Sequence, residues 1–579
     1  MLSAIREIGE LTKDKPNEAR IGMDASVVVI LIEASSQKYL GVDIEDFDSK
    51  KIEKYLFKPG ASKGNVPWPF CPLTESNRSF KKIYRWLGKC KKNIENRKND
   101  GSRDYIELLA KACKILEDNK DLTITNIIQK TNEFSKKNPK FLTIKIDGKY
   151  LGEYDVFRKC LACFDEGKRR RSANQGICSI CGNFDNEVSG KTDVFKFYTI
   201  DKPGFITGGF KEINAWKNYP VCSKCETLLE SGKAYIENNL NFKFYGFSYL
   251  LIPRLLIGGK EKGKEILNIL STTKKGIGLG ERVIKRITDD ENEILENISM
   301  RQDILTLNFL FLQRKQSAER ILLLIEDIFP SRIRRIFDAK DYVDKIFDNE
   351  PERAFTFGTL RTFFSKSDDS KRTSDLDKYF LNIVGSVFIG EKIDFSFLLV
   401  FFMAVIRKEF INDRYFKFRT KDALMIMIFL EHLEIMSFIE EVYMEDNIFS
   451  SIFSRYGKSF GNPAKRGVFL TGALTQLLLN KQWADRKAKP FMKKLKGLKL
   501  EEKDVKALLP EVQNKLEEYD SFDSGKKLLS CEAAKYLLEA GDGWKMSVNE
   551  INFYFACGMN LADEVAKKIY SKENNKKEE

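Results

Sequence analysis

The sequence predicts an α+β protein of several domains, with a mixed N-terminal domain, a zinc-ribbon-like cysteine-rich module and a C-terminal helical bundle. Three observations support this prediction. The chain has 579 residues, which is too long for a single hydrophobic core. Apolar, β-branched runs occur in its first part, whereas helical periodicity dominates its last part. Between them lie cysteines paired as CxxC.

The N-terminal domain, residues 1–159, is expected to mix helices and strands. The opening "MLSAIREIGELTK" has the pattern of an amphipathic helix, and "ASVVVILIEA" (25–34) that of a buried strand. The segment "SFKKIYRWLGKCKKNIENRK" is basic and helical in pattern. A hairpin is expected in "FLTIKIDGKYLGEY", with its turn at Asp147-Gly148.

The remainder divides into three regions. Residues 160–245 form the cysteine-rich module, which also contains the strand-like "VFKFYTID". Residues 246–415 are expected to be mainly helical, as in "ERILLLIEDIFPSRIRRIF", and residues 416–579 are predicted to form the bundle. The most apolar window (395–406) covers only 12 residues, too few to cross a membrane, so no membrane partner is expected.

Composition narrows the possible chemistry. The chain contains one histidine, His432, which argues against His-dependent zinc hydrolases and nucleases and against Ser-His-Asp enzymes. No signal peptide pattern opens the sequence, so a cytoplasmic, reducing location in a prokaryotic cell is expected. In that environment paired cysteines indicate metal binding more often than a disulfide.

Four cysteines are the preferred metal ligands: Cys178, Cys181, Cys222 and Cys225. Two CxxC turns supply the four thiolates that tetrahedral Zn²⁺ requires, and such a set leaves no open position for water. The expected cofactor is therefore structural Zn²⁺. The 40-residue spacer between the pairs requires the surrounding fold to bring them together.

A third pair, Cys160 and Cys163, lies closer to Cys178 and offers an alternative ligand set. Cys160 belongs, however, to a run of apolar residues with helical spacing that begins at Phe157, which indicates a core position. Whether this pair joins the metal site stays open. So does the simpler possibility that all six cysteines are buried free thiols.

The charge pattern favours a polyanionic partner, because the net charge is +14 and residues 451–500 alone carry +11. In that segment the predicted nucleic-acid contacts are Lys465, Arg466, Arg486 and Lys487, interleaved with Phe469, Trp483 and Phe491. Two further groups are candidates: the loop residues Lys58, Ser62, Lys63 and Asn65, and the run Lys168, Arg169, Arg170 and Arg171. The alternative for the loop residues is an ordinary surface turn, and the alternative for the basic run is a solvated run of charges.

Longer segments resemble a known family. The stretch "FKFYTIDKPGFITGGF…AWKNYPVCSKCETLLESGKAYIENNLNFKFYGFSYLLIP", with "CSICG" before it, is similar to the large subunit of the type I-B CRISPR Cascade. The opening "MLSAIREIGEL", "GVFLTGALTQLLLNKQ" and "SVNEINFYFACGMNLA" fit the same family, so the resemblance covers most of the chain.

The resemblance implies a non-catalytic subunit of an RNA-guided surveillance complex. It implies that the N-terminal part recognises the PAM in double-stranded target DNA, and that the C-terminal part resembles the small subunit and supports the displaced single strand. The implied partners are crRNA, the Cascade backbone subunits, the small subunit and a recruited helicase-nuclease. Cys178, Cys181, Cys222 and Cys225 match the zinc-ligand pattern of the family.

Three points stay open at this level. The family's small subunit can arise from an internal start, and Met425, Met427, Met436 and Met444 precede the predicted bundle. An enzyme of nucleic-acid metabolism that uses only carboxylates and magnesium is an alternative function. A zinc-containing RNA-binding protein is a weaker one.

Overall fold

The computed structural model describes residues 1–12, 25–57, 66–95, 102–132, 140–161, 173–190, 194–195, 211–256, 259–276, 305–315, 318–348, 354–368, 370–412, 416–438 and 447–575. It confirms an α+β protein of several domains with a cysteine cluster and a helical C-terminal region. The chain forms two compact units. The first comprises Met1–Asn241, Gly259–Ser271 and Arg314–Arg320, and the second Phe242–Gly258, Thr272–Gln313 and Ile321–Glu579.

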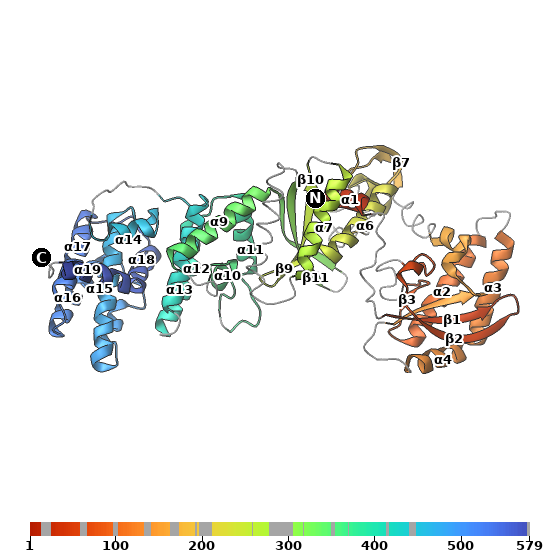
Figure 1. Ribbon diagram of the computed structural model, residues 1–579, viewed down its shortest axis with the longest axis horizontal. Coiled ribbons are helices and arrows are strands. Elements are labelled where there is room, and N and C mark those ends of the chain that lie inside the picture. Colours follow the sequence, from red (N-terminus) through yellow and green to blue (C-terminus); the bar gives the residue numbers. More distant parts are fainter. Residues whose placement is uncertain are drawn as a thin grey trace. The chain divides into compact units, whose positions relative to one another are not determined.

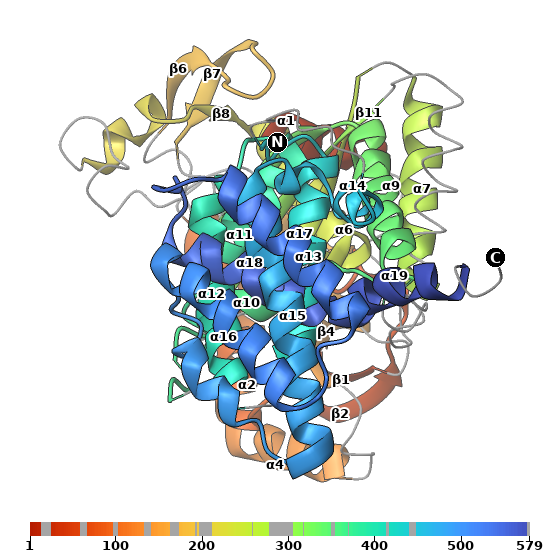
Figure 2. The same ribbon diagram turned by 90° about the vertical axis from the view of Figure 1, so that its left-hand side faces the viewer.

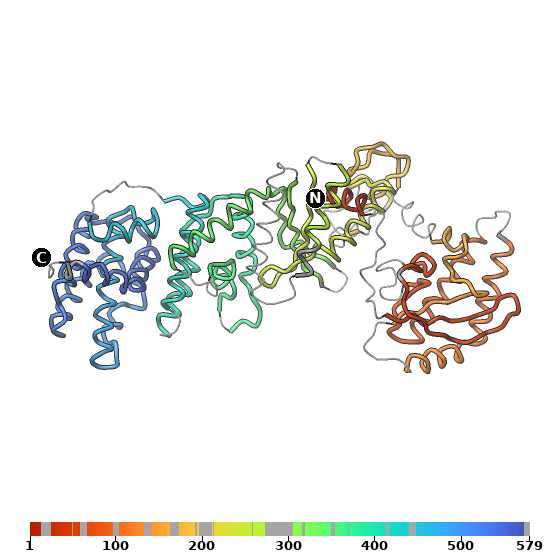
Figure 3. Tube along the Cα trace, in the orientation of Figure 1, coloured from red at the N-terminus to blue at the C-terminus, as the bar shows by residue number. Residues whose placement is uncertain are grey.

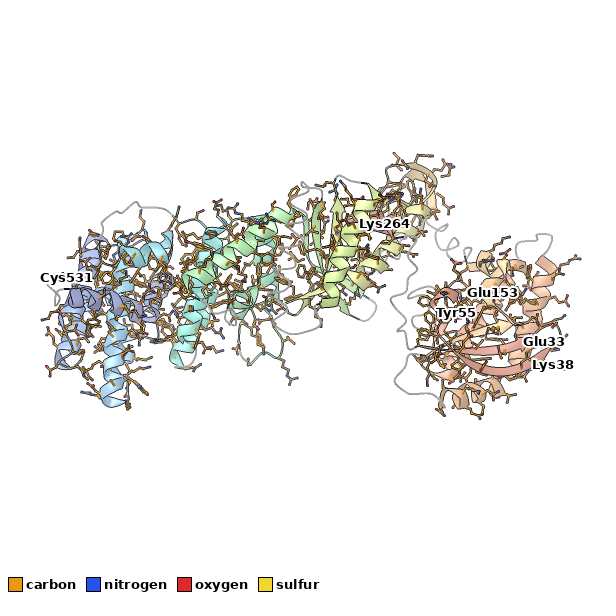
Figure 4. The ribbon with its side chains drawn as sticks, viewed as in Figure 1. Glu33, Lys38, Tyr55, Glu153, Lys264 and Cys531 are labelled. Carbon is orange, nitrogen blue, oxygen red and sulfur yellow. The ribbon has the colours of Figure 1, made fainter. Side chains whose placement is uncertain are left out.

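The first unit contains an α/β domain built on a sheet of strand order β2-β1-β4-β3, with β5 paired to β4 (Figure 1). Its strands are β1 (Ser26–Glu33), β2 (Lys38–Asp46), β3 (Cys71–Pro72), β4 (Lys140–Ile146) and β5 (Lys149–Tyr150). Its helices are α2 (Ser76–Glu95), α3 (Ser102–Asp118) and α4 (Lys120–Asn132). The predicted strand at 25–34 and the basic helix are both present. Glu33, at the end of β1, and Lys38, at the start of antiparallel β2, are opposite one another in the strand register (Figure 4).

Both faces of this sheet are covered. Val28, Ile30 and Ile32 of β1 pack against the buried sides of α2 and α3, while Val27 and Val29 pack against aromatic residues from the segment after β2. A strand buried on both faces is expected to be continuously apolar, as "VVVILI" (27–32) is. The predicted turn is also present, since Asp147 and Gly148 both have positive φ (47° and 75°) between antiparallel β4 and β5.

The first unit also contains the cysteine-rich module (Figure 2). Strands β6 (Ala173–Ile177), β7 (Phe184–Ser189) and β8 (Val221–Cys222) form an antiparallel sheet, and α6 (Ser223–Asn239) follows β8 directly. The N-terminal helix α1 (Leu2–Leu11) packs on α6 although more than 200 residues separate them in sequence (Figure 1). Helix α7 (Lys260–Gly276) begins in this unit. The strand expected in "VFKFYTID" falls almost wholly outside the described residues.

The described residues of the stretch 246–415 are mainly helical, as the sequence predicts, but they also contribute to a four-stranded sheet that lies mostly in the second unit. Its strands are β9 (Asn241–Phe244), β10 (Phe247–Leu255), β11 (Leu305–Lys315) and β12 (Ala318–Ile328), in the order β12-β11-β10-β9. The segment "ERILLLIEDI", predicted as helix, is therefore strand. Short apolar runs do not separate a buried strand from a buried helix, and pairing with β11 decides the outcome here.

The helices that follow this sheet along the chain are α9 (Pro330–Ile346), α10 (Phe357–Phe363), α11 (Asp377–Ile389), α12 (Phe395–Ile411) and α13 (Phe416–His432). Of these, α10 and α11 contact the sheet through aromatic side chains. Ring pairs join strand to helix, for example Phe309 to Phe388 at 5.0 Å and Phe244 to Phe357 at 5.3 Å between centroids. The predicted helix at 395–406 lies in α12, with one side buried. None of the described helices is both long and apolar enough to cross a bilayer.

The chain ends in the predicted helical bundle, whose trace is blue in Figure 3. Its helices are α14 (Ser450–Arg455), α15 (Pro463–Arg486), α16 (Glu502–Glu518), α17 (Ser524–Glu539), α18 (Val548–Asn560) and α19 (Ala562–Asn575). Helix α15 is buried on almost every side and packs against α16, α17, α18 and α19. This explains why "GVFLTGALTQLLL" is apolar almost all round.

Candidate metal centre

Two tight turns place the cysteines. Cys178 and Cys181 lie in the turn between β6 and β7, and Cys222 ends β8 and is the N-cap of α6, with Cys225 in the first turn of that helix. Strand β7 pairs with β8 so that Val188 faces Cys222. The β7–β8 ladder is therefore the element that closes the 40-residue gap in sequence.

The four sulfur atoms lie within 4.8 Å of one another. A tetrahedral zinc ion with Zn–S bonds of about 2.3 Å separates its ligand sulfurs by about 3.8 Å, so a small contraction completes the site. Three of the four cysteines are buried, and Cys181 is partly exposed. The donor atoms thus fit zinc in their number, in being sulfur and in their spacing. The residues that would hold the ion are Cys178, Cys181, Cys222 and Cys225.

Backbone hydrogen bonds fix the first turn. The Cys178 N–H donates to the carbonyl of Asn183 at 2.9 Å, and the Gly182 N–H donates to the carbonyl of Cys178 at 2.9 Å. The Ser179 N–H reaches the carbonyl of Pro220 at 2.8 Å, so the first turn is tied to the residues just before the second. Gly182 has φ +72°, a conformation that favours glycine and explains the Gly after Cys181.

The thiols do not share one electrostatic environment. Burial opposes ionisation of Cys178, but hydrogen bonds from the backbone N–H groups of Cys222, Cys181 and Ile180 outweigh it and lower its pKa to about 7. Burial, together with the neighbouring thiols, raises the pKa of Cys225. Burial also raises the pKa of Cys222, so Cys178 ionises more readily than Cys222 or Cys225.

An arginine from the start of the chain completes the surroundings. Burial would lower the pKa of Arg6 on α1, but interaction with the sulfur of Cys225 and the nearby charges of Glu10 and Cys181 raise it overall. Glu10 lies 3.6 Å from the Arg6 guanidinium, measured from Oε2 to Nη2. Four thiolates around Zn²⁺ carry a net charge of −2, and Arg6 is placed to offset part of it.

Helix α1 can supply this arginine because it approaches α6 closely. A Cβ at Gly9 would lie 1.9 Å from the carbonyl oxygen of Leu228, and one at Gly232 would lie 1.9 Å from that of Ile5. The sequence pattern indicates that α1 is amphipathic but does not indicate which element it packs on. The glycine inside its apolar face was the available signal.

Family comparisons cover the three parts of the chain. Models of the CRISPR-associated protein TM1802 (cas_TM1802) match with their N-terminal domain at residues 1–162, their central domain at 175–328 and their C-terminal domain at 355–573. The chain belongs to the CRISPR-associated TM1802 family. A role in CRISPR defence follows from this membership. None of the curated proteins matches the chain.

Of the third cysteine pair in this TM1802-family protein, the structure describes only Cys160. Cys160 is 3% exposed and belongs to the core beneath α2, next to Cys90. That agrees with the helix-face pattern noted in the sequence. Cys163 lies outside the described residues, as do the candidate loop at 58–65 and the basic run at 168–171.

Two of the predicted nucleic-acid contacts in the bundle are engaged within the protein. Lys465 Nζ lies 3.0 Å from Glu550 Oε1 and sits over the ring of Tyr554. The Arg466 Nε–H donates to the carbonyl of Phe460 at 2.7 Å, and its guanidinium lies over the ring of Phe453. Both side chains therefore contribute to the packing around α15.

The other two predicted contacts are exposed. Arg486 and Lys487 lie at the end of α15, where Lys487 is the C-cap, and Arg486 lies over the ring of Tyr519. Of the three aromatic residues noted in the segment, Phe469 and Phe491 are buried and Trp483 is half exposed. Further exposed cations follow α15: Lys493, Lys494, Lys496 and Lys499.

Proposed function

We propose that this TM1802-family protein is the non-catalytic large subunit of a type I-B RNA-guided surveillance complex. In this role it binds crRNA together with Cascade backbone subunits and a small subunit, checks the PAM in target duplex DNA and supports the displaced strand. The observation that carries the proposal is the family match across all three parts of the chain. The type I-B assignment itself rests on the sequence resemblance.

The metal centre supports a structural role for the metal. Four sulfur donors fill a tetrahedral coordination sphere and leave no position at which a water or a substrate oxygen could bind. When bound, zinc would join the β6–β7 turn to the start of α6. Arg6 would hold α1 against the same cluster, so that the beginning of the chain and the cysteine-rich module are stabilised together.

Support for strand binding comes from the exposed surface at the end of α15. Arg486, Lys487, Lys493 and Lys499 are exposed there, and Trp483 offers a half-exposed ring for stacking. Lys465 and Arg466 contribute by shaping the helix that carries this surface. PAM reading is assigned to the N-terminal domain, with Lys58, Ser62, Lys63 and Asn65 as candidates from sequence alone.

A cleavage assay separates this proposal from the carboxylate- and magnesium-dependent enzyme. The purified chain is incubated with labelled single- and double-stranded DNA and with RNA, in Mg²⁺ or Mn²⁺. The proposal predicts salt-sensitive binding and intact nucleic acid. Cleavage that is lost when one Asp/Glu cluster is changed to Asn/Gln would contradict it.

A further inference from the structure

Helix α2 carries a continuous row of exposed cations. The row consists of Arg78, Lys81, Arg85, Lys89 and Lys92, all exposed, and we call it the α2 basic stripe. Steps of three and four residues place its members on one side of the helix. The opposite side, which includes Phe80, Ile83 and Trp86, is buried in the core of the α/β domain.

The stripe lacks the acids that a solvated helix surface normally contains. Between Glu75 and Glu95 the sequence has no Asp or Glu. Among the described residues, the one ion pair of the stripe joins Arg78 to Glu75 at 3.7 Å, where both side chains are more than half exposed. The adjacent α3, by contrast, pairs Lys111 with Glu107 at 2.8 Å at spacing i,i+4.

This arrangement costs stability. Lys81, Arg85 and Lys89 are successive i,i+4 neighbours of like charge, and each such pair destabilises a helix by about 0.2–0.5 kcal/mol. The packing of α2 in the core does not require these charges, because their side chains point away from it. A partner of opposite charge would turn the repulsion into binding energy.

We propose that the α2 basic stripe binds the phosphate backbone of a nucleic-acid duplex. At a rise of about 1.5 Å per residue, Arg78 to Lys92 span about 21 Å, a length over which one DNA strand presents about six phosphates. The stripe is a straight row of cations on a helix held rigidly by the core. It therefore matches a regular, stiff polyanion.

The aromatic residues of α2 favour a duplex over a single strand. Phe80 and Trp86 are buried, and the Tyr84 hydroxyl donates to Glu117 at 3.2 Å. Tyr84 is partly buried and its ring packs on that of Phe80, so α2 presents no ring as exposed as that of Trp483 in the bundle, which is 50% exposed. Lysine and arginine without stacking groups read the backbone, so the contact is independent of base sequence.

The inference rests on the proposed function and assigns the N-terminal domain a second contact, separate from the candidate PAM loop. The test measures binding of the full chain to a 30-base-pair duplex of arbitrary sequence over a range of KCl concentrations. The variant combines Lys81→Gln, Arg85→Gln and Lys89→Gln. Its matched control combines Lys38→Gln, Lys120→Gln and Lys149→Gln, three exposed lysines dispersed over β2, α4 and β5 of the same domain.

The stripe variant is expected to bind duplex about 100-fold more weakly near 0.1 M salt, and the slope of log K against log salt should become shallower by about 2.7. The control should keep most of the wild-type slope. Equal slopes for the stripe variant and the control would overturn the inference. So would an equal loss of affinity for an acidic polypeptide, which would indicate a protein partner instead.

A second variant guards against misfolding. Arg85→Glu creates opposite-charge pairs with Lys81 and Lys89, so it should melt at or above the wild-type temperature while losing duplex affinity. The recovery of guide RNA with the stripe variant from native cells separates the two proposals. If guide RNA is recovered but the stripe variant binds duplex as the control does, only the inference about the stripe is overturned. If the stripe variant loses duplex affinity but no guide RNA is recovered, only the proposed function is overturned.

Discussion

The backbone N–H of Cys222 donates a hydrogen bond to the sulfur of Cys178 at 3.4 Å, across 44 residues of sequence. This contact joins the two CxxC turns directly. It exists because β7 and β8 pair in a register that places Cys222 opposite Val188. Hydrogen bonds from backbone N–H groups to sulfur stabilise a thiolate, so the same geometry that brings the turns together prepares them for a metal.

Replacing Cys178 or Cys222 with serine should remove the bound zinc. Each change deletes one of four donors from a closed site, and structural zinc contributes its binding energy to folding. Metal content per chain should fall from about one to near zero, and the melting temperature should drop. Cys531→Ser, which changes an exposed cysteine on α17, is the control. Full zinc occupancy in both site variants would contradict the ligand assignment.

Arg6→Gln should weaken zinc retention without removing a ligand. The variant loses the positive charge beside Cys225, and changes to groups around the ligands typically cost 10–100-fold in metal affinity. Competition with a chromophoric chelator measures this, and Arg6→Lys should restore part of the loss. Lys260→Gln provides the control, since Lys260 pairs with Glu10 at 3.1 Å and not with the sulfurs. Equal zinc affinity in Arg6→Gln and Lys260→Gln would refute the role of Arg6.

Gly9→Ala should separate α1 from α6. The added methyl group would lie 1.9 Å from the carbonyl oxygen of Leu228, so the helices must move apart at a cost of about 1–3 kcal/mol. The control is Gly88→Ala on α2, where no atom lies within 4 Å of the new Cβ. That change should stabilise the protein by about 0.5–1 kcal/mol. Denaturant unfolding distinguishes the two, and the same sign for both would contradict the close crossing.

The bundle variants should divide into two classes. Lys465→Gln leaves Glu550 without its partner, so it should lower stability with little effect on the salt dependence of single-strand binding. Arg486→Gln combined with Lys487→Gln removes exposed charges and should reduce the salt slope by about 1.4 while leaving the melting temperature nearly unchanged. If both variants alter binding equally, Lys465 contacts nucleic acid after all.

The sequence supported correct predictions wherever local pattern decides structure. The buried strand at 25–34, the turn at Asp147-Gly148 and the helices of the bundle follow from periodicity and turn chemistry. The prediction of a helix at 319–328 was wrong because its apolar run suits either a buried strand or a buried helix, and pairing with β11 makes it a strand.

The site residues, too, could be predicted only where the local sequence decides their placement. The four cysteines could be selected from spacing and local context, because CxxC turns are local. The place of Arg6 could not, since it depends on packing between helices more than 200 residues apart. Nor could a count of charges show that Lys465 faces Glu550 while Lys487 faces solvent, because that depends on how α15 is surrounded.

The assignment as a large subunit is tested by affinity purification of the tagged protein from its native cell. The RNA recovered with it is sequenced, and the proteins are identified. The proposed function predicts repeat-derived guide RNA together with several backbone subunits in fixed proportion, whose association survives moderate salt. A chain recovered alone, or with RNA unrelated to CRISPR repeats, would contradict the assignment as the large subunit of a surveillance complex.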